Sequence, residues 1–405
     1  FGTTAPERMQ ALFRASEMTR GSLNEKSVRA LYGDKLRLSA SRIDKFASCR
    51  FAYFMQYGLK AKTREPAGFE PPEMGIFMHF ILENVAHEVM QAGGFKKISD
   101  DELLALTDKY IAEYVHSTLN DFKEKSKRFE YLFRRLTKNV RQVVLDMANE
   151  LRCSDFAPLS FELDFGKADI LPPLKLGEGE DSLILTGIAD RVDGWLHDGR
   201  LYLRVVDYKT GRKSFSLSDV WYGMGLQMLL YLFSLGENGH LLYGNEIVPA
   251  GVLYVPARDV MLSASADMSD EEIADKKSKE VKRSGLLLDD PDVINAMEHG
   301  EAPRYIPVKF KEGVARGDAL ASAERLGLLA KHIDKTLRGM AAELRHGSIA
   351  ANPYYRKQQE NACLNCDYFD ACHFVDGENG ESVHKTPKLE ATRVWNILEG
   401  GEDGV

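Results

Sequence analysis

The stretch LTGIADRVDGWLHDGRLYLRVVDYKTG, residues 185–211, decides the fold. Two apolar-rich runs in it flank an Asp-Gly pair at 198–199, and Asp-Gly between such runs is a strong β-hairpin signal. In a strand, residues i and i+2 share a face, so Asp207 and Lys209 project together, and the hairpin brings Asp190 alongside them. Two carboxylates and an ammonium on one sheet face predict a divalent-cation site with a charged helper.

The bulk composition is that of a soluble globular protein. The chain has 405 residues, enough for one large domain or two ordinary ones, and is 44% hydrophobic and 28% charged. No window approaches the roughly 18 uninterrupted apolar residues of a membrane span, and no export signal follows Phe1. We therefore expect a cytoplasmic protein. The missing initiator Met indicates a processed chain or a piece of a longer polypeptide, and we favour the second.

Basic residues gather between positions 123 and 141, although the formal net charge of the chain is -8. They are Lys123, Lys125, Lys127, Arg128, Arg134, Arg135, Lys138 and Arg141, with Phe129, Tyr131 and Phe133 between them. One interpretation is an amphipathic helix with a solvated basic face. The other is a surface that follows a phosphate backbone, because phosphate contacts require such clustering.

The order of the expected elements favours an α/β or α+β fold around one mixed sheet. Helices are expected at 42–59 (capped by Ser39 or Ser41), 74–90, 217–235, 318–346 and 393–398, with helical periodicity throughout 100–152. Strands are expected at 159–165, in the hairpin, at 246–256 and at 305–310. The segments 60–73 and 166–181 read as loops, and 268–284 as a charged, peripheral insertion.

Two of the expected helices carry further candidate site residues. His79 and Glu83 lie four residues apart, as do Gln227 and Tyr231, so each pair shares a helix face. Glu83 is either a helper of the site or a partner within its own helix. Asp193 lies three residues after Asp190, hence on the other strand face unless a bulge intervenes, and ranks second to it.

The cysteines predict a metal centre or cluster. Cys363, Cys366 and Cys372 have the spacing C-x2-C-x5-C, which places thiolates within reach of one centre. Cys49 is the best candidate for a fourth ligand, and His373 or Cys153 are the alternatives. Spacing alone does not choose between zinc and iron–sulfur, because both take thiolates.

The combined acidic, imidazole and lysine set predicts metal-dependent phosphodiester hydrolysis. A hard cation such as Mg²⁺ prefers carboxylate oxygens and tolerates one imidazole. Hydrolysis of a phosphodiester needs an activated water and neutralisation of charge on the phosphate, and a lysine can assist both.

The chain resembles the PD-(D/E)XK nuclease superfamily through Asp190, Asp207 and Lys209, its D…D-x-K signature. Finer motifs resemble the RecB/AddB-type branch, above all the C-terminal nuclease domain of AddB subunits of bacterial AddAB helicase–nucleases. These motifs are G-x-x-x-H at 75–79, G-x-x-D-R-V-D at 187–193, D-Y-K-T-G at 207–211, Q-x-x-x-Y at 227–231 and the four-cysteine pattern. The resemblance covers residues 36–375 and implies a restriction-endonuclease-like core with helical insertions and a cysteine-ligated iron–sulfur staple.

The resemblance also implies a role for each matching residue. His79, Asp190 and Asp207, with the Tyr208 carbonyl, would bind one or two Mg²⁺ ions, and Lys209 would be the catalytic lysine. Gln227 and Tyr231 would position the DNA or that lysine. A [4Fe-4S] cluster would be held by Cys49, Cys363, Cys366 and Cys372.

The implied function is DNA exonuclease activity within a helicase–nuclease that processes double-strand ends for recombinational repair. DNA and an AddA-type motor protein are the implied partners, and no G-x-x-x-x-G-K-[ST] phosphate loop occurs in the chain itself. We expect residues 1–35 to connect to an upstream region, 36–375 to form the nuclease domain with insertions at 100–152 and 260–300, and 376–405 to form a tail. The alternatives are a stand-alone cluster-bearing single-strand exonuclease and a nuclease-dead DNA-binding scaffold.

Overall fold

The protein is represented by a computed structural model that describes residues 9, 20–62, 71–122, 126–166, 171–172, 175–176, 183–211, 214–258, 268–300 and 302–401. Lys123 and Lys125 of the basic segment lie outside these residues. So do most of 1–19, parts of the loops expected at 60–73 and 166–181, residues 260–267 of the charged insertion, and 402–405.

The helices are α2 (Glu25–Tyr32), α3 (Ala40–Ser48), α4 (Arg50–Tyr53), α5 (Pro71–Gln91), α6 (Asp100–Ser117), α7 (Lys127–Arg152), α8 (Leu217–Trp221), α9 (Gln227–Tyr243), α10 (Asp270–Val281), α11 (Pro291–Met297), α12 (Ala323–Arg345), α13 (Phe369–Cys372) and α14 (Ala391–Leu398). The strands are β1 (Leu36–Ser39), β2 (Ala157–Asp164), β3 (Lys175–Leu176), β4 (Leu183–Thr186), β5 (Ile188–His197), β6 (Arg200–Lys209), β7 (Glu246–Pro256), β8 (Ser284–Leu288), β9 (Lys309–Lys311), β10 (Val314–Arg316), β11 (Leu320–Ala321), β12 (Tyr354–Lys357), β13 (Glu360–Asn361) and β14 (His384–Lys385).

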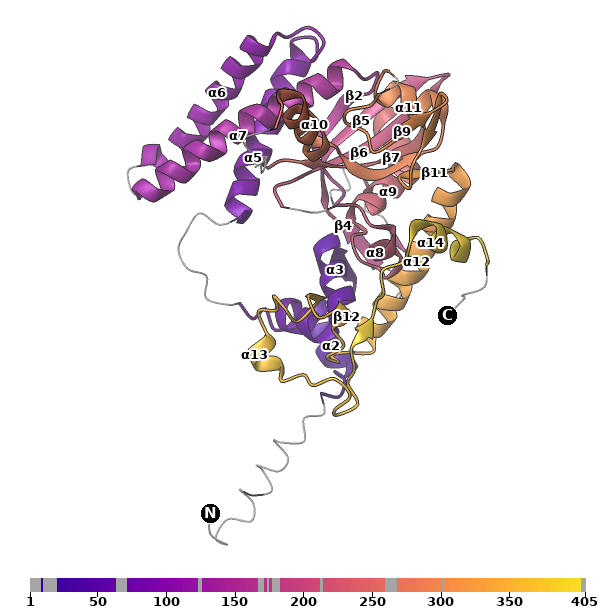
Figure 1. Ribbon diagram of the computed structural model, residues 1–405. Helices are drawn as coiled ribbons and strands as arrows, with labels where there is room; N and C mark the ends of the chain where they lie inside the picture. The colour runs from indigo at the N-terminus through magenta and orange to yellow at the C-terminus, as the bar shows by residue number, and fades with distance from the viewer. Residues whose placement is uncertain are drawn as a thin grey trace.

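The largest sheet contains six strands in the order β11-β8-β7-β6-β5-β2. The predicted hairpin is present as β5 and β6, which pair antiparallel. Strand β6 then pairs parallel with β7, and β7 pairs antiparallel with β8. The prediction of a mixed central sheet flanked by helices is therefore confirmed (Figure 1).

Different helices cover the two faces of this sheet. On one face, the Tyr208 hydroxyl donates to Met147 Sδ of α7 at 3.0 Å. On the other face, α9 packs so closely that a Cβ on Gly236 would lie 3.1 Å from Pro249 Cγ of β7. Pro249 is paired with Leu203, and side chains alternate along β6, so Asp207 projects to the α9 face.

A network of buried charges lies between the sheet and α7. Arg204 Nε donates to Asp193 Oδ2 at 2.8 Å, and Arg204 Nη2 donates to Glu150 Oε1 at 3.1 Å. Arg283 pairs with Glu150 at 2.8 Å, and Arg191 pairs with Asp193 at 2.8 Å. Each of these side chains is at most 1% exposed. Buried charges are tolerated only when paired in this way.

Three predicted helical segments are interrupted. Cys49 has an extended backbone, with φ -168° and ψ 126°, and divides the segment expected at 42–59. Gly223 and Gly225 have φ of 78° and 67° and divide the segment expected at 217–235, so Gln227 becomes the first residue of α9. A turn at Asp121, with φ 52°, separates α6 from α7. The strand expected at 305–310 was also wrong, because only β9 is formed there.

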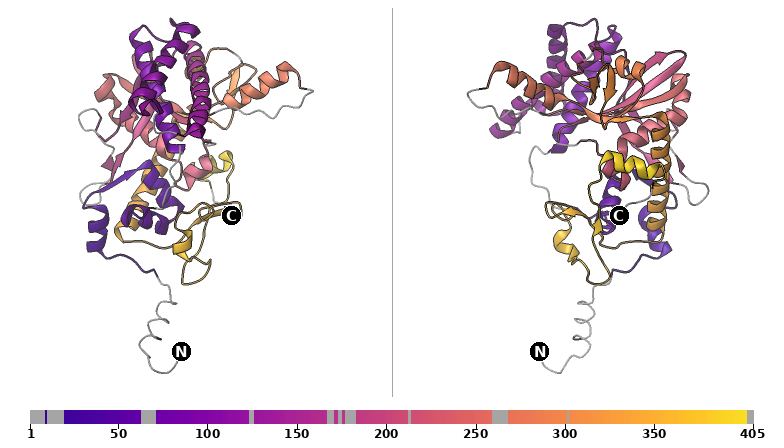
Figure 2. Two further views of the ribbon diagram at one scale, coloured as in Figure 1. Left: turned by 90° about the vertical axis from the view of Figure 1, so that its left-hand side faces the viewer. Right: turned by 45° about the vertical axis from the view of Figure 1, so that its right-hand side comes forward.

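Helices α2–α4, α12 and α13 and the small sheet β13-β12-β14 form a second group of elements beside the main sheet (Figure 1). The parallel pairing of β1 with β4, from Leu36↔Leu183 to Ser39↔Thr186, connects the N-terminal segment to the strand that precedes the hairpin. Helix α10 projects away from the rest of the fold (Figure 2). None of the helices in the described ranges is long and apolar enough to span a bilayer.

Replacing Glu150 by Gln should destabilise the fold by about 3 kcal/mol, because it leaves buried guanidinium groups without their counter-charge. Burial alone would raise the pKa of Glu150, but the charges of Arg283, Arg204 and Arg191 outweigh it and lower the pKa to about 2. The stabilisation is therefore present above the ordinary carboxyl pKa and is lost as pH falls toward 2. Urea unfolding at pH 7 measures the effect.

The exposed Glu113 of α6 provides the matched control, since Glu113→Gln removes the same charge from a solvated position. Equal unfolding midpoints for the two variants would mean that the network adds no stability.

Candidate active site

Asp190 and Asp207 each lie one residue beyond the end of the β5–β6 ladder, whose last paired positions are Arg191 and Val206. Directly opposed residues share a sheet face, so both carboxylates project to the α9 side. The Tyr208 N–H donates to Asp190 Oδ2 at 2.8 Å and fixes this carboxylate across the strand end. The Asp190 side chain is 10% exposed and Asp207 is 2% exposed. The structure therefore brings two carboxylates together in a nearly water-free position.

His79 of α5 lies at the same edge of the sheet. Its Nδ1 is 3.0 Å from Glu162 Oε1 and 3.7 Å from Asp190 Oδ1. Among the residues that the structure describes, His79, Glu162 and Asp190 are the only group of at least three His, Cys, Asp or Glu whose ligand atoms lie within 4.8 Å of one another. This is a donor set that suits a divalent cation.

Glu162 is the residue that the sequence analysis missed. It lies in β2 with φ 46°, a conformation that is uncommon for residues other than glycine and that often occurs at functional sites. The alternation in SFELDF, residues 160–165, places Glu162 on a polar strand face. Strand β2 pairs with β5 so that Phe161 is opposite Arg191 and Leu163 is opposite Ala189, which places Glu162 beside Asp190. Nothing in the sequence shows this pairing.

The electrostatics of the site favour a cation. Burial and the charge of Asp207 raise the pKa of Asp190 to about 7, against smaller opposing effects of His79, the Tyr208 N–H and Lys209. Burial alone would lower the pKa of His79, but its hydrogen bond to Glu162 and the nearby carboxylates raise it. Carboxylates held this close repel each other when ionised, and a bound cation relieves that repulsion.

Lys209 supplies the positive charge next to these carboxylates. Its Nζ lies 2.5 Å from Asp207 Oδ2, as expected for residues i and i+2 of one strand. The ammonium also lies 5.8 Å from the ring centroid of buried Tyr254. The Lys209 side chain is 24% exposed, so the ammonium remains accessible from solvent.

Gln227 and Tyr231 of α9 lie behind the carboxylates. A hydrogen bond joins the Gln227 side chain to the Tyr231 hydroxyl, and burial raises the pKa of Tyr231 to about 12. The Tyr231 ring stacks on Phe165 with a centroid distance of 4.7 Å. A Cβ on Gly187 would lie 2.0 Å from the Tyr231 hydroxyl oxygen, so this position accepts only glycine. The glycine of the G-x-x-D motif therefore makes room for this tyrosine.

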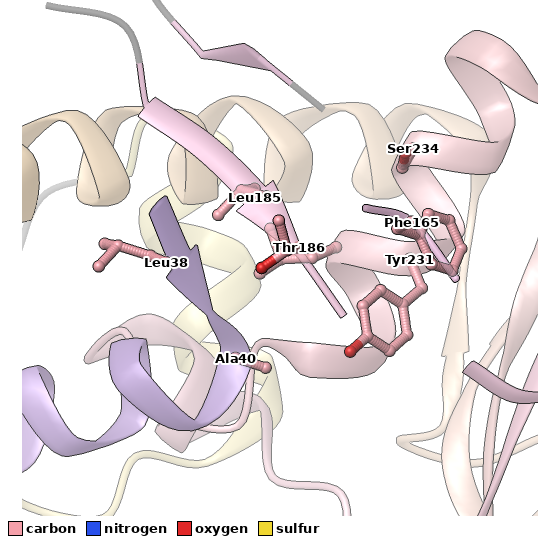
Figure 3. A pocket seen from close by; sticks show the side chains of 8 residues that line it. Leu38, Ala40, Phe165, Leu185, Thr186, Tyr231 and Ser234 are labelled. Atoms are coloured by element: carbon pink, nitrogen blue, oxygen red, sulfur yellow. The ribbon is translucent and has the colours of Figure 1, made fainter. Parts of the chain in front are cut away.

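A small apolar cavity lies beside the Tyr231 ring (Figure 3). It is lined by Leu38, Ala40, Phe165, Leu185, Thr186, Leu230, Tyr231 and Ser234. In Figure 3 the rings of Tyr231 and Phe165 lie side by side, and the Tyr231 hydroxyl points away from Ser234. No charged residue lines this cavity, so it suits packing of the ring rather than chemistry.

Two other acidic candidates lie elsewhere. Asp193 is on the opposite sheet face, where it is held by Arg191 and Arg204, so its rank below Asp190 agrees with the geometry. Glu83 is half-buried on α5, and burial followed by the charge of Glu162 raises its pKa. Glu83 therefore lies close enough to Glu162 to influence the site.

The basic helix α7 has a mixed environment. Phe133 is 2% exposed and stacks in parallel with Phe129, whereas Tyr131 is 63% exposed. Arg141 pairs with Asp108 of α6 at 2.6 Å. Lys127, Arg128, Arg134, Arg135 and Lys138 are exposed. The helix is thus amphipathic, and its basic face is open to solvent.

Four of the five cysteines line one cavity between α4 and the C-terminal segment. They are Cys49, Cys363, Cys366 and Cys372, and the other walls are mainly apolar, including Phe51, Ala52, Pro353, Phe369 and Phe374. Neither His373 nor Cys153, the alternative fourth ligands, lines this cavity, and Cys153 is exposed at the end of α7. Within the described residues no three sulfur atoms lie mutually within 4.8 Å.

Burial opposes ionisation of Cys49, Cys363 and Cys372 in this cavity. Burial raises the pKa of Cys49, against smaller opposing effects of backbone hydrogen bonds at Ala52 and Asn352. Arg20 Nη2 lies 3.3 Å from the Cys372 sulfur. Burial, with the neighbouring cysteines, raises the pKa of Cys363 to about 11. Without a bound metal these groups are therefore protonated at neutral pH.

Comparison with known proteins places this geometry in a family. A family model described as the PD-(D/E)XK nuclease superfamily matches residues 37–373. The chain belongs to the PD-(D/E)XK nuclease superfamily. Nucleases of this superfamily generally use a divalent metal ion, and His79, Glu162 and Asp190 form a donor set that could hold one here.

Similar proteins are named as the B-type subunit of an ATP-dependent helicase/deoxyribonuclease. One from Thermoanaerobacter sp. (strain X514) is 34% identical over 382 residues, which is 92% of this chain and 33% of the relative. One from Clostridium botulinum (strain Okra / Type B1) is 34% identical over 406 residues, which is 97% of this chain and 35% of the relative. One from Clostridium acetobutylicum is 31% identical over 386 residues, which is 93% of this chain and 33% of the relative. The chain thus spans about a third of the length of these curated relatives.

Replacing Asp190 by Asn should stabilise the metal-free protein at high pH. A raised carboxyl pKa means that folding is opposed by ionisation, so wild-type stability falls as pH rises from about 4 to about 7 and is then level. The gain in the variant should be near zero at pH 4 and reach at most about 4 kcal/mol above pH 7. Urea unfolding in EDTA across this range measures it.

Asp198→Asn in the exposed β5–β6 turn is the matched control, because it removes the same charge from a position that is 88% exposed. A variant at position 190 that is less stable than wild type at pH 8 would show that the ionised carboxylate is favoured in the fold.

Proposed function

We propose that this chain is the nuclease part of a helicase–nuclease and hydrolyses DNA phosphodiester bonds as a metal-dependent exonuclease. The observation that carries the proposal is the group of His79, Glu162 and Asp190 next to the Asp207–Lys209 pair. Oxygen ligands for a hard cation and an adjacent ammonium are what phosphodiester hydrolysis needs. Membership of the nuclease superfamily supports the same conclusion.

In this proposal His79, Asp190 and Asp207, together with the Tyr208 carbonyl, hold Mg²⁺. The donors fit, because two of them are nearly buried carboxylates whose repulsion a cation would remove. When bound, Mg²⁺ activates water and neutralises negative charge on the phosphate. Glu162 holds the imidazole of His79 in place through their hydrogen bond.

Lys209 is the proposed catalytic lysine. Its ammonium is held beside Asp207 and stays partly exposed, so it can orient the attacking water or stabilise charge on the phosphate. Gln227 fixes the Tyr231 hydroxyl at the back of the site, and we assign this pair to positioning the DNA strand or Lys209.

The Asp207→Ala protein should lose Mg²⁺-dependent degradation of an end-labelled single-stranded oligonucleotide by more than about a hundredfold, because the loss removes a metal ligand and the partner of Lys209. Gel analysis of product lengths also tests exonuclease action, since successive shortening is expected from one end.

The matched control is Glu324→Ala, an exposed acidic position in the first turn of α12. Unchanged cleavage by the Asp207→Ala protein would contradict the assignment of Asp207 to the active site. Mg²⁺-independent binding without any cleavage would favour the alternative of a nuclease-dead scaffold.

We further propose that Cys49, Cys363, Cys366 and Cys372 bind a [4Fe-4S] cluster. Four thiols in one apolar cavity, backbone hydrogen bonds at the Cys49 sulfur and a nearby guanidinium suit an anionic cluster. A zinc ion with Zn–S bonds near 2.3 Å needs sulfur atoms about 3.8 Å apart. In the part of the chain that the structure describes, no three sulfur atoms lie mutually within 4.8 Å, so the cysteines do not form a ready-made zinc site.

Anaerobically purified protein should be brown and contain about four iron atoms per chain. The Cys366→Ala protein should lose the iron and the visible absorption and should melt at a lower temperature, because the bound group joins distant segments. The Cys153→Ala protein is the control and should keep both. Stoichiometric zinc in colourless wild-type protein would refute the cluster.

The larger setting is also a proposal. The names of the relatives support a role in a complex with an AddA-type ATPase, processing DNA ends for recombinational repair in the cytoplasm. These relatives are about three times as long as the matched region, which favours this setting over a stand-alone exonuclease. Co-purification of a large ATPase with the full-length protein tests the partnership.

The proposed nuclease domain is 36–375, with 1–35 as connector and 376–405 as tail. Residues on both sides of this domain also pack against the fold, because Val28 of α2 and Trp395 of α14 are buried.

A further inference from the structure

A second pocket opens next to the proposed active site, between α5, α7 and the C-terminal ends of β6 and β7. Met74, Leu132, Arg135, Asn139, Thr210 and Arg258 line its sides. Buried Leu136 and Ala257 also contribute to it. Its volume is about 260 Å³. At ~30 Å³ per water this is room for about nine waters, similar to the number of non-hydrogen atoms in a nucleobase.

The pocket is continuous with the catalytic strand end. Thr210 follows Lys209 directly, and the Ala257 N–H donates to the Lys209 carbonyl at 2.9 Å. Met74 precedes His79 by five residues of α5, a rise of about 7.5 Å. The pocket therefore begins at the residue after Lys209 and lies about one and a half turns of α5 before His79.

The chemistry of the lining combines apolar and cationic groups. Met74, Leu132 and Leu136 offer apolar surface, and Leu132 is 38% exposed despite its type. Arg135 and Arg258 contribute guanidinium groups. Arg258 Nη2 donates to Glu280 of α10 at 3.0 Å, which orients this side chain and leaves other N–H groups of the five available. Apolar surface with guanidinium groups beside it is complementary to a base and its flanking phosphates.

Helix α7 shows which of its basic residues belong to the pocket. A helix turns by about 100° per residue, so Arg128, Leu132, Arg135 and Asn139 form one stripe. Three of these four residues line the pocket. Lys127, Arg134, Lys138 and Arg141 form another stripe, about 120° away, and none of them lines it. Only the first stripe of the basic segment therefore faces the pocket.

We propose that this pocket receives an unstacked nucleobase next to the phosphodiester that is cut, while Arg135 and Arg258 contact the flanking phosphates. The proposal rests on the nuclease function proposed above and specifies its substrate as an unpaired DNA strand. A base in a duplex is stacked and paired and reaches the pocket only after being extruded, at a cost of a few kcal/mol. The pocket thus selects single strands and frayed ends.

Binding of abasic oligonucleotides tests the base pocket. The 405-residue chain is titrated in EDTA, so that no strand is cut, with dye-labelled single strands that carry one abasic position at successive sites. Wild type should show one position where loss of the base weakens binding by about five- to a hundredfold, the range expected for a stacked base. Leu132→Ala should remove most of this position-specific loss, whereas Tyr131→Ala, which changes an exposed neighbour outside the pocket, should keep it.

The salt dependence of binding tests the guanidinium contact. Arg135→Ala should reduce the slope of log K against log salt by about one, as expected for one lost phosphate contact, and Arg134→Ala should leave it unchanged. The proposal would be overturned if the two arginine variants had equal effects, or if every abasic position weakened binding by the same amount. Either result would indicate that the protein binds only the phosphates of the strand.

Cleavage in Mg²⁺ is measured separately on the same proteins. If wild type degrades DNA but shows no position-specific abasic loss, this inference fails while the proposed function stands. If wild type does not degrade DNA, the proposed function fails, whatever the binding data show.

Discussion

The register of the β5–β6 hairpin is the constraint on which the site depends. Side chains alternate along a strand, so a slip of one residue would carry Asp190 to the α7 side and bring Arg191 to the face of Asp207. The buried network opposes such a slip, because Asp193 of β5 pairs with Arg204 of β6. Asp193 also pairs with Arg191 of β5, and Arg204 also pairs with Glu150 of α7. A slip would leave buried charges without partners, which is among the most costly changes a fold can undergo. The ionic face of the hairpin thus fixes the geometry of its catalytic face.

The two faces of the same hairpin use charge in opposite ways. Beneath the sheet, three guanidinium groups meet two carboxylates, so both carboxylates have cationic partners within the protein. Above it, Asp190, Asp207 and Glu162 meet one ammonium and one imidazole, and burial together with the charge of Asp207 raises the pKa of Asp190. The first arrangement is stable by itself, whereas the second is stabilised by a bound cation. The two faces differ in the number of cationic side chains that meet the carboxylates.

Local sequence patterns predicted much of the fold and most of the candidate site, and the failures have physical causes. The hairpin, β7 and α12 follow from turn chemistry and periodicity, and Asp190, Asp207 and Lys209 follow from strand alternation. The break at Cys49 was missed because the residue is extended for reasons of tertiary contact, not of propensity. The division at Gly223 and Gly225 was missed because glycine also occurs inside helices. Glu162 was missed because its role depends on which strand lies beside β5, a pairing between distant segments that no local pattern encodes.

The cysteine cavity makes the integrity of the domain depend on complete synthesis. Cys49 precedes all the residues of the carboxylate–lysine set, and Cys363, Cys366 and Cys372 follow them, yet all four line one cavity. During translation, every side chain of the proposed chemistry leaves the ribosome before the segment that meets Cys49. A chain that stops early after Tyr231 therefore carries the full set of reactive groups without the contact that joins the ends of the domain. Such a product also lacks β7, β8 and β11, so neither the central sheet nor the cysteine cavity is complete.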